Sequence, residues 1–290
     1  MKLKPRNINE SEIDLPLSCS IFLEPALEKY KDCITPVPED IIKFLHEWNT
    51  ALVHLARTPK VFSKLGDTGK TLLKDSRFAK ECVFHGLNVP THSFHYAVRF
   101  SEGYNFAANK LNNLKKDNEI SPIFTDFGAG LMPLAPIIGT NFDSVRSYAI
   151  ELPAVAELLH MVAREVGVDG KFQIENDISS VESDANNPGV AISLGVLPHM
   201  TRAEQLKNLK YINKHFQHFY IEMLISDGEK SLDRKSFDEK TLEDFGIDVK
   251  TFYKFVSFGI ESKRKYQQQK SLLPNLRKGV VSDKLWFIGR

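Results

Sequence analysis

The residues best suited to ligand binding are two glycines and an acidic residue that follow successive apolar segments. In "IFTDFGAGLMPL", residues 123–134, an apolar run ends at Asp126, Gly128 and Gly130 follow, and a helical pattern begins. Glycine lacks a Cβ, so the backbone of such a turn can approach a ligand closely. Glu151 ends the next apolar segment, where an acidic side chain can accept hydrogen bonds from both hydroxyls of a ribose. This spacing predicts a nucleoside site, although an acidic residue at a strand end can also be a helix cap.

The turn differs from a dinucleotide-binding loop. The pattern G-x-G-x-x-G requires a third glycine, but Pro133 stands in that place, and no arginine follows to take a phosphate. The turn therefore favours an adenosine ribose without a pyrophosphate and disfavours a nicotinamide dehydrogenase. S-adenosylmethionine has this chemistry, because it carries adenine, a ribose diol and a zwitterionic amino-acid tail but no phosphate.

Four segments resemble the class I S-adenosylmethionine-dependent methyltransferases. "FTDFGAG", "YAIELP" and "IENDI" are similar to the consecutive cofactor motifs of that family, and "GVAISLGVLPHM" is similar to its fourth strand. The resemblance covers roughly residues 121–225 and departs from the strongest pattern in having two glycines rather than three in the turn. It implies S-adenosylmethionine as the cofactor. The implied cofactor site comprises Asp126, Phe127, Gly128, Ala129 and Gly130 at the turn, Glu151 on the ribose, Leu152, Asp177 and Ile178 at the adenine, and Ser193, Leu194 and Gly195 near the sulfonium.

Residues for catalysis and for the acceptor are predicted on either side of these motifs. His199 lies just beyond the fourth apolar segment, beside the expected methyl group, where it could act as a base or orient the acceptor. It could equally cap the next helix or face water. In similar methyltransferases the segment before the first strand often closes over the cofactor. This implies Arg99 at the cofactor carboxylate and an acceptor wall of His92, His95, Tyr96 and Tyr104, with an ordinary amphipathic helix as the alternative.

A parallel sheet would bring these motifs together. Beyond Ser121, apolar runs alternate with helical patterns, which is typical of a parallel sheet with covered faces; the runs are "IFTDFG", "SYAIEL", "KFQIEN", "GVAISLGVL" and "HFYIEML". Pro153 and Gly167 delimit the helix after the second run. The resemblance implies an α/β, Rossmann-like, mostly parallel seven-stranded sheet in the order 3-2-1-4-5-7-6, with helices on both faces and strand seven antiparallel. "FYKFVSFGIES" and "DKLWFIGR" are candidates for the last two strands.

Residues 1–120 are predicted to form a mainly helical unit. The first 20 residues are polar, apolar positions recur at helical spacing between Pro38 and Leu55, and further helical patterns lie near 68–82 and 94–115. This unit could supply an acceptor pocket, a lid or a dimer interface. Residues 121–290 form the predicted cofactor-binding domain.

Composition narrows the function classes. The formal net charge of +1 argues weakly against a dedicated nucleic-acid binder. Three cysteines without a CxxC pair, no apolar core of a signal peptide and no run of about 18 apolar residues favour a reduced, cytoplasmic protein without a membrane span. We expect a monomer or homodimer. His92 with His95, and His215 with His218, have the spacing of one helix face, but no further ligand completes either pair, so no metal is predicted.

Three functions remain open at this point. The leading hypothesis is O- or N-methylation of a small-molecule acceptor, because "ELPAV" resembles the second-strand end of small-molecule O-methyltransferases. The second is a ribosomal RNA methyltransferase, because "GAGLMPLAP" has some likeness to enzymes that confer aminoglycoside resistance. The basic residues in 262–278 could follow a phosphate backbone, although such a run is more often a solvated loop. The third is a non-catalytic binding module that kept the fold.

Overall fold

The computed structural model describes the parts of the chain that carry the predicted motifs. They are residues 23–29, 31–32, 34–56, 90–114, 121–181, 183, 187–197, 200–224 and 284–289. The predicted helix near 68–82, the segment "FYKFVSFGIES", the basic cluster 262–278 and His199 lie outside the described residues, as do Cys19, Cys33 and Cys82. No described helix has the length and apolar character needed to cross a membrane.

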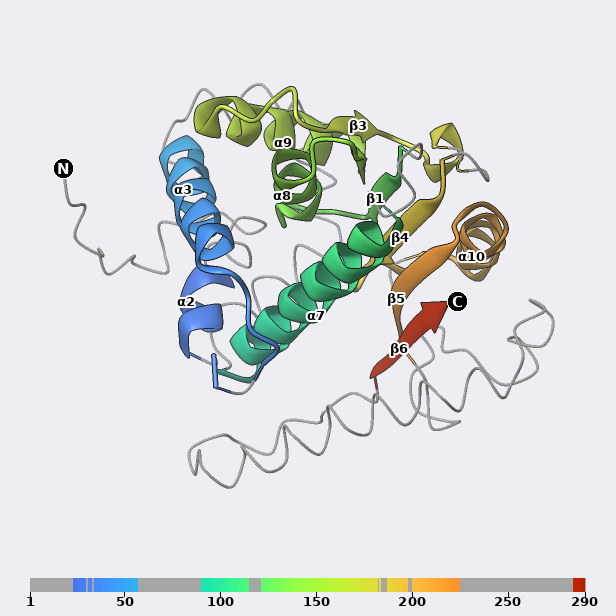
Figure 1. Cartoon of the computed structure of the whole chain (residues 1–290), viewed down its shortest axis with the longest axis horizontal. Coiled ribbons are helices and arrows are strands. Elements are labelled where there is room, and N and C mark those ends of the chain that lie inside the picture. The colour runs from blue at the N-terminus through green and yellow to red at the C-terminus, as the bar shows by residue number, and fades with distance from the viewer. Residues whose placement is uncertain are drawn as a thin grey trace.

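The centre of the molecule is a mostly parallel sheet. The described strands lie in the order β3-β2-β1-β4-β5-β6, and only β6 is antiparallel to its neighbour. Figure 1 shows β6, in red, lying beside β5. The strands are β1 (Ile123–Phe127), β2 (Arg146–Ile150), β3 (Gln173–Glu175), β4 (Gly189–Ser193), β5 (His218–Leu224) and β6 (Lys284–Gly289).

This topology confirms the Rossmann-like α/β fold. Parallel strands covered on both faces read as continuous apolar runs, and all five positions of β1 and of β4 are buried. The order 3-2-1-4-5 matches the prediction, and the C-terminal "LWFIG" segment supplies the antiparallel strand next to β5. A seventh strand is not among the described residues, so that part of the sheet stays a prediction.

Helices cover the sheet on both faces. In Figure 1 the upper end of the long helix α7 lies in front of β1 and β4, α8 and α9 lie to the left of the strands, and α10 lies to the right of β5. The α-helices are α2 (Leu23–Lys29), α3 (Glu39–Ala56), α7 (Pro90–Leu114), α8 (Leu134–Asn141), α9 (Pro153–Val166) and α10 (Arg202–His215), and a 3₁₀ turn η3 spans Ile178–Ser180.

Local sequence explains where two of these helices begin and end. Pro153 begins α9, where its missing N–H costs nothing, and Gly167 ends the helix in a left-handed conformation with φ of 82°. Thr201 begins α10 with a capping box, because its side chain accepts from the Glu204 amide while the Glu204 carboxylate accepts from the Thr201 amide. These signals set where α9 begins after β2 and where α10 begins after β4.

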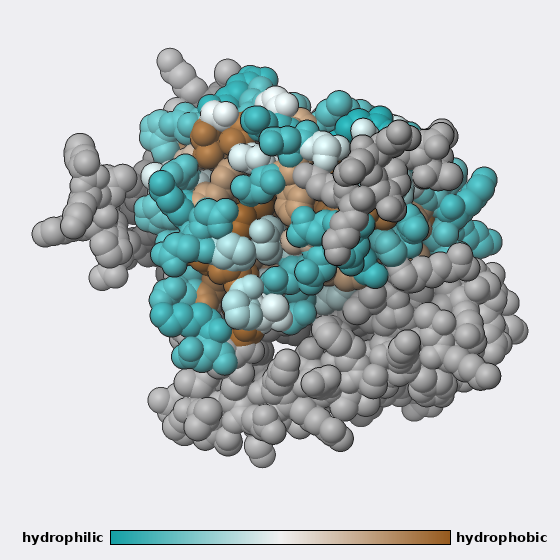
Figure 2. Space-filling view, viewed as in Figure 1, coloured by the Kyte–Doolittle hydropathy of each residue, from teal (hydrophilic) through white to brown (hydrophobic). Residues whose placement is uncertain are grey.

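The two faces of the sheet pack against different helices. One core joins Phe124 of β1 and Ile192 of β4 to side chains of α2, α3, α7, α8 and α9. The other joins Ile123 and Ile221 to Ile212 of α10. The described N-terminal helices therefore share one core with the sheet. The space-filling view in Figure 2 shows apolar side chains between α2–α3 and α7, framed by hydrophilic ones. The division of function at residue 120 stays a prediction.

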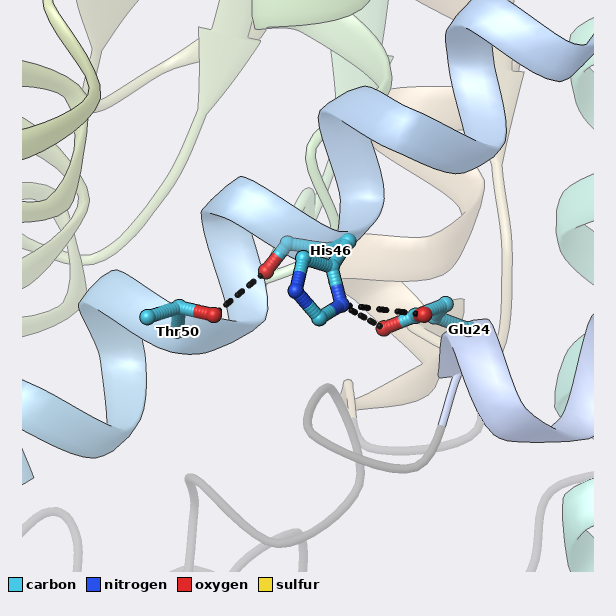
Figure 3. Close-up of polar contacts among 3 residues, drawn as sticks. All are labelled: Glu24, His46 and Thr50. Carbon is cyan, nitrogen blue, oxygen red and sulfur yellow. Dashed lines mark hydrogen bonds and ion pairs between the residues drawn. The ribbon is translucent and has the colours of Figure 1, made fainter. Parts of the chain in front are cut away.

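Polar contacts also hold the N-terminal helices together. Nδ1 of His46 on α3 lies 3.1 Å from both carboxylate oxygens of Glu24 on α2, and the Thr50 hydroxyl donates to the His46 carbonyl at 2.8 Å (Figure 3). At its other end, α3 reaches α9, where His54 Nδ1 lies 3.0 Å from Glu165 Oε1. Exposed pairs of this kind contribute about 0–1 kcal/mol each, so the shared core remains the main attachment.

Candidate functional site

The predicted cofactor residues meet at the carboxyl edge of the parallel sheet. β1 ends at Phe127, β2 at Ile150 and β4 at Ser193, and the three strands are neighbours in register. Ligands of open α/β sheets bind outside the carboxyl ends of the strands, where the strand order reverses. In this sheet the reversal lies between β1 and β4. The glycine turn after β1 therefore occupies the position that the fold offers for a ligand.

The turn needs its glycines for two separate reasons. Gly128 and Gly130 have φ of 73° and 58°, in the left-handed region that favours glycine. Space is also short at Gly128, because an added Cβ would lie 2.0 Å from Cγ2 of Val196 in the loop after β4. The Gly128 amide continues the sheet by donating to the Ile150 carbonyl at 2.9 Å. The turn after β1 and the loop after β4 are therefore in tight contact.

Glu151 lies directly against the glycine turn. Its Oε1 accepts from the Gly130 amide at 2.5 Å, and its Oε2 accepts from the Leu152 amide at 2.9 Å. Burial raises the pKa of Glu151, while the two backbone hydrogen bonds oppose that rise because they favour the charged form. Each carboxylate oxygen can accept a further hydrogen bond. The side chain is thus held where it could accept from a ribose diol.

Asp126 is the second acidic group at this edge. It is buried, with 2% of its surface exposed, and burial raises its pKa well above the ordinary value, with the charge of Glu151 raising it further. Among the described residues, its Oδ2 and the Ser193 hydroxyl have no hydrogen-bond partner. Buried polar atoms normally have one, and these two atoms lack it at the neighbouring ends of β1 and β4.

Residues predicted at the adenine lie beyond β2 and β3. Leu152 is 54% exposed at the start of α9, an unusual position for a large apolar side chain that a flat ring could cover. Asp177 caps η3 by accepting from the Ser179 amide at 2.8 Å, and its Oδ2 lies 3.6 Å from Lys207 Nζ. The hydrogen bonds from Ser179 lower the pKa of Asp177 most, and Lys207 lowers it further. Ile178 is buried in the core on the α10 face.

Helix α7 brings the predicted acceptor segment next to the site. An added Cβ on Gly103 would lie 3.2 Å from Cδ1 of Leu194, so α7 packs closely on the loop after β4. Arg99 and Tyr104 are buried, and Tyr104 stacks on Phe100 with ring centroids 6.3 Å apart. His92, His95 and Tyr96 belong to the first turns of α7, and their side chains lie outside the described part of the structure. Their roles and that of His199 stay predictions.

The sequence analysis missed one contact of this site. Trp48 of α3 donates its indole N–H to the carbonyl of Leu131 in the glycine turn, at 3.0 Å in a buried setting. In the sequence, Trp48 is only one of the apolar positions that recur at helical spacing between Pro38 and Leu55. Because 83 positions separate the two partners, no local pattern could have indicated the hydrogen bond.

A groove of about 690 Å³ lies along α9. Leu55, Met161 and Ile174 are among its apolar lining, and Glu157, His160 and Arg164 are among its polar lining. The groove reaches Pro153, next to Leu152, but the residues of the glycine turn do not line it. We place the candidate site at the turn, because the convergent acidic groups and the strand ends lie there.

One histidine prediction is wrong. His215 ends α10 and His218 begins β5, so the two do not share a helix face. Phe216, which caps α10 in an extended conformation, breaks the helical spacing between them. Within the described ranges, no three His, Cys, Asp or Glu side chains come together in a group that could hold a metal ion.

Comparisons with known proteins place the likeness in the structure rather than in the sequence. No family model matches the chain, and no curated protein matches it. The chain is similar to the solved structure of the mitomycin 7-O-methyltransferase MmcR, with 17% identity, a TM-score of 0.35, and 65% of this chain and 53% of that chain covered. It therefore spans about half the length of that protein.

Two further solved structures are similar to the chain. One is the N,N-8-amino-8-demethyl-D-riboflavin dimethyltransferase RosA from Streptomyces davawensis, with 16% identity, a TM-score of 0.35, and coverage of 68% of this chain and 65% of that chain. The other is the magnesium protoporphyrin IX methyltransferase ChlM from Synechocystis PCC 6803 with bound SAM, with 11% identity, a TM-score of 0.42, and coverage of 62% and 83%. These likenesses concern the fold.

Proposed function

We propose that the chain is an S-adenosylmethionine-dependent methyltransferase that acts on a small-molecule acceptor. The observation that carries this proposal is the placement of Glu151, whose carboxylate rests on the Gly130 amide at the carboxyl edge of the sheet. A ribose diol needs such an acceptor at the end of the second strand. The predicted motifs for the turn, the ribose and the sulfonium all lie at this edge.

The charge of the site supports a cofactor without phosphate. A phosphate at a glycine turn is held by backbone N–H groups, but the Gly130 amide already donates to Glu151. The Glu151 carboxylate, whose charged form is favoured by the hydrogen bonds from Gly130 and Leu152, would repel a pyrophosphate. Acidic groups instead favour the ammonium and sulfonium of S-adenosylmethionine, and this difference separates it from a nicotinamide dinucleotide.

The residues divide into those that hold the cofactor and those that face the acceptor. When bound, S-adenosylmethionine supplies a methyl group on a sulfonium, which an acceptor nucleophile takes by in-line displacement. Asp126 and the glycines would line its methionine part, Glu151 would bind the ribose, and Leu152 would cover the adenine. Helix α7 would shape the acceptor side and exclude water, and His199 would accept the proton of the acceptor or orient it.

Titration calorimetry of the full chain with S-adenosylmethionine tests the proposal. We expect binding by the wild type and a loss of about 10- to 100-fold in Glu151→Gln, because hydrogen bonds to charged groups are worth about 1.5–3 kcal/mol. Glu157→Gln is the matched control, since Glu157 is an exposed carboxylate on α9. It should bind like the wild type. Absence of binding by the wild type would favour a non-catalytic module instead.

The acceptor requires a different measurement. Mass spectrometry of small molecules retained by the purified protein would identify a bound acceptor together with the cofactor or its demethylated product. The basic cluster 262–278, on which the RNA alternative depends, lies outside the described residues. Salt-sensitive binding to ribosomal subunits that weakens on neutralising Lys263, Arg264 and Lys265 would favour that alternative over a small molecule.

A further inference from the structure

A buried hydrogen bond joins helix α3 to the glycine turn. The donor is the indole N–H of Trp48, and the acceptor is the Leu131 carbonyl, 3.0 Å away. Trp48 is fully buried, and its ring stacks with that of Phe44, with centroids 6.0 Å apart. A buried carbonyl that loses its partner is unfavourable, so the indole stabilises this particular orientation of the turn.

The turn is therefore held at two successive residues. The Gly130 amide donates to Glu151 on one side, and the Leu131 carbonyl accepts from Trp48 on the other. Both residues belong to the short segment between β1 and α8. Gly130 has φ of 58° and, as a glycine, has more backbone freedom than other residues. The two hydrogen bonds restrict that freedom in the segment on which Glu151 rests.

We propose that Trp48 is a positioning residue of the cofactor site. By holding the Leu131 carbonyl, its indole N–H fixes the Gly130 amide against Glu151 and so fixes the carboxylate that would bind the ribose. Helix α3 thereby takes part in cofactor binding, beyond any role of the N-terminal unit in an acceptor pocket or dimer interface. The identity of the ligand rests on the proposed function, whereas the hold on the turn rests on the described contacts alone.

The test compares Trp48→Phe with Phe44→Leu in the full chain. Trp48→Phe keeps an aromatic ring but removes the donor. Phe44→Leu reduces the same ring stack and leaves the donor in place. We measure S-adenosylmethionine affinity by calorimetry, unfolding by temperature, and amide exchange at Gly130 without cofactor. Both variants should lower the melting temperature. Only Trp48→Phe should weaken cofactor binding, by about tenfold, which corresponds to about 1.4 kcal/mol. Only Trp48→Phe should also speed amide exchange at Gly130, by a similar factor.

The outcomes separate this proposal from the proposed function. Unchanged affinity and exchange in Trp48→Phe would overturn the positioning role, as would equal losses in both variants. If the wild type binds no S-adenosylmethionine while Gly130 exchange still depends on the indole donor, the function fails but the hold on the turn stands. Should Trp48→Phe fold poorly, 3-benzothienylalanine at position 48 serves instead, because it keeps the shape of indole and lacks the N–H.

Discussion

Substituting Gly128 by alanine tests whether steric contact with the loop after β4 shapes the cofactor turn. The added Cβ would lie 2.0 Å from Val196 Cγ2 and 2.7 Å from Cγ1, whereas unbonded carbons lie about 3.5–4.0 Å apart. Overpacking of this kind typically costs about 1–3 kcal/mol. The positive φ of 73° adds a left-handed conformation that costs an alanine about 1–2 kcal/mol.

Gly167→Ala is the matched control for the backbone term. Gly167 has φ of 82°, and an added Cβ would have nothing within 4 Å. We expect Gly167→Ala to lower the free energy of unfolding by about 1 kcal/mol, since reduced freedom of the unfolded chain offsets part of the strain. Gly128→Ala should lower the free energy of unfolding by about 2–4 kcal/mol, because the steric overlap with Val196 adds to the same backbone cost.

Urea unfolding of four variants provides the assay: wild type, Gly128→Ala, Val196→Ala and the double substitution. Val196→Ala removes both methyl groups that the new Cβ would meet and leaves the Val196 Cβ, 2.8 Å away. Gly128→Ala should therefore cost about 1–2 kcal/mol less in that background. Equal costs in both backgrounds, or a cost no larger than that of Gly167→Ala, would refute the steric reasoning.

Two further predictions concern stability. The folded-state pKa of Asp126 is raised, so the stability that this group contributes is fully present below its unfolded pKa and is lost as pH rises through its folded pKa. Asp126→Asn should therefore become more stable relative to the wild type as pH increases. Urea unfolding at several pH values checks this, and a stability difference that does not change with pH would contradict it. Thr201→Ala removes the capping box of α10 and should cost about 1 kcal/mol in the same assay. Ser180→Ala, at an exposed position of η3, should be near neutral.

The parts of the site that were predictable depend on local pattern. Strands β1 and β4 were found because burial on both faces makes a parallel strand a continuous apolar run. The turn was found because two glycines follow an apolar run, and the structure gives both a positive φ, 73° and 58°, which favours glycine. Glu151 was found because its distance from the turn along the chain matches a strand and a helix between them, and the structure places it on the Gly130 amide.

The parts that were missed depend on packing between distant segments. Trp48 appeared only as a member of an apolar stripe, because its hydrogen bond to Leu131 spans 83 positions. The contact of Gly128 with Val196 also joins two loops that meet only in the folded sheet. His215 and His218 were misplaced because a helical period was extended past Phe216, where α10 ends and β5 follows.

These contacts together explain which ligand the turn can select. Two of its amides are already engaged, Gly128 with the Ile150 carbonyl and Gly130 with Glu151. Beside them the Glu151 carboxylate offers acceptor oxygens, and Asp126 adds a buried carboxyl. A ligand that enters must bring hydrogen-bond donors or positive charge, because a buried carboxyl without a partner is unfavourable. A second anion next to that carboxyl would be still less favourable. A ribose diol with a cationic tail meets this requirement, whereas a phosphate would bring a second negative charge next to Glu151.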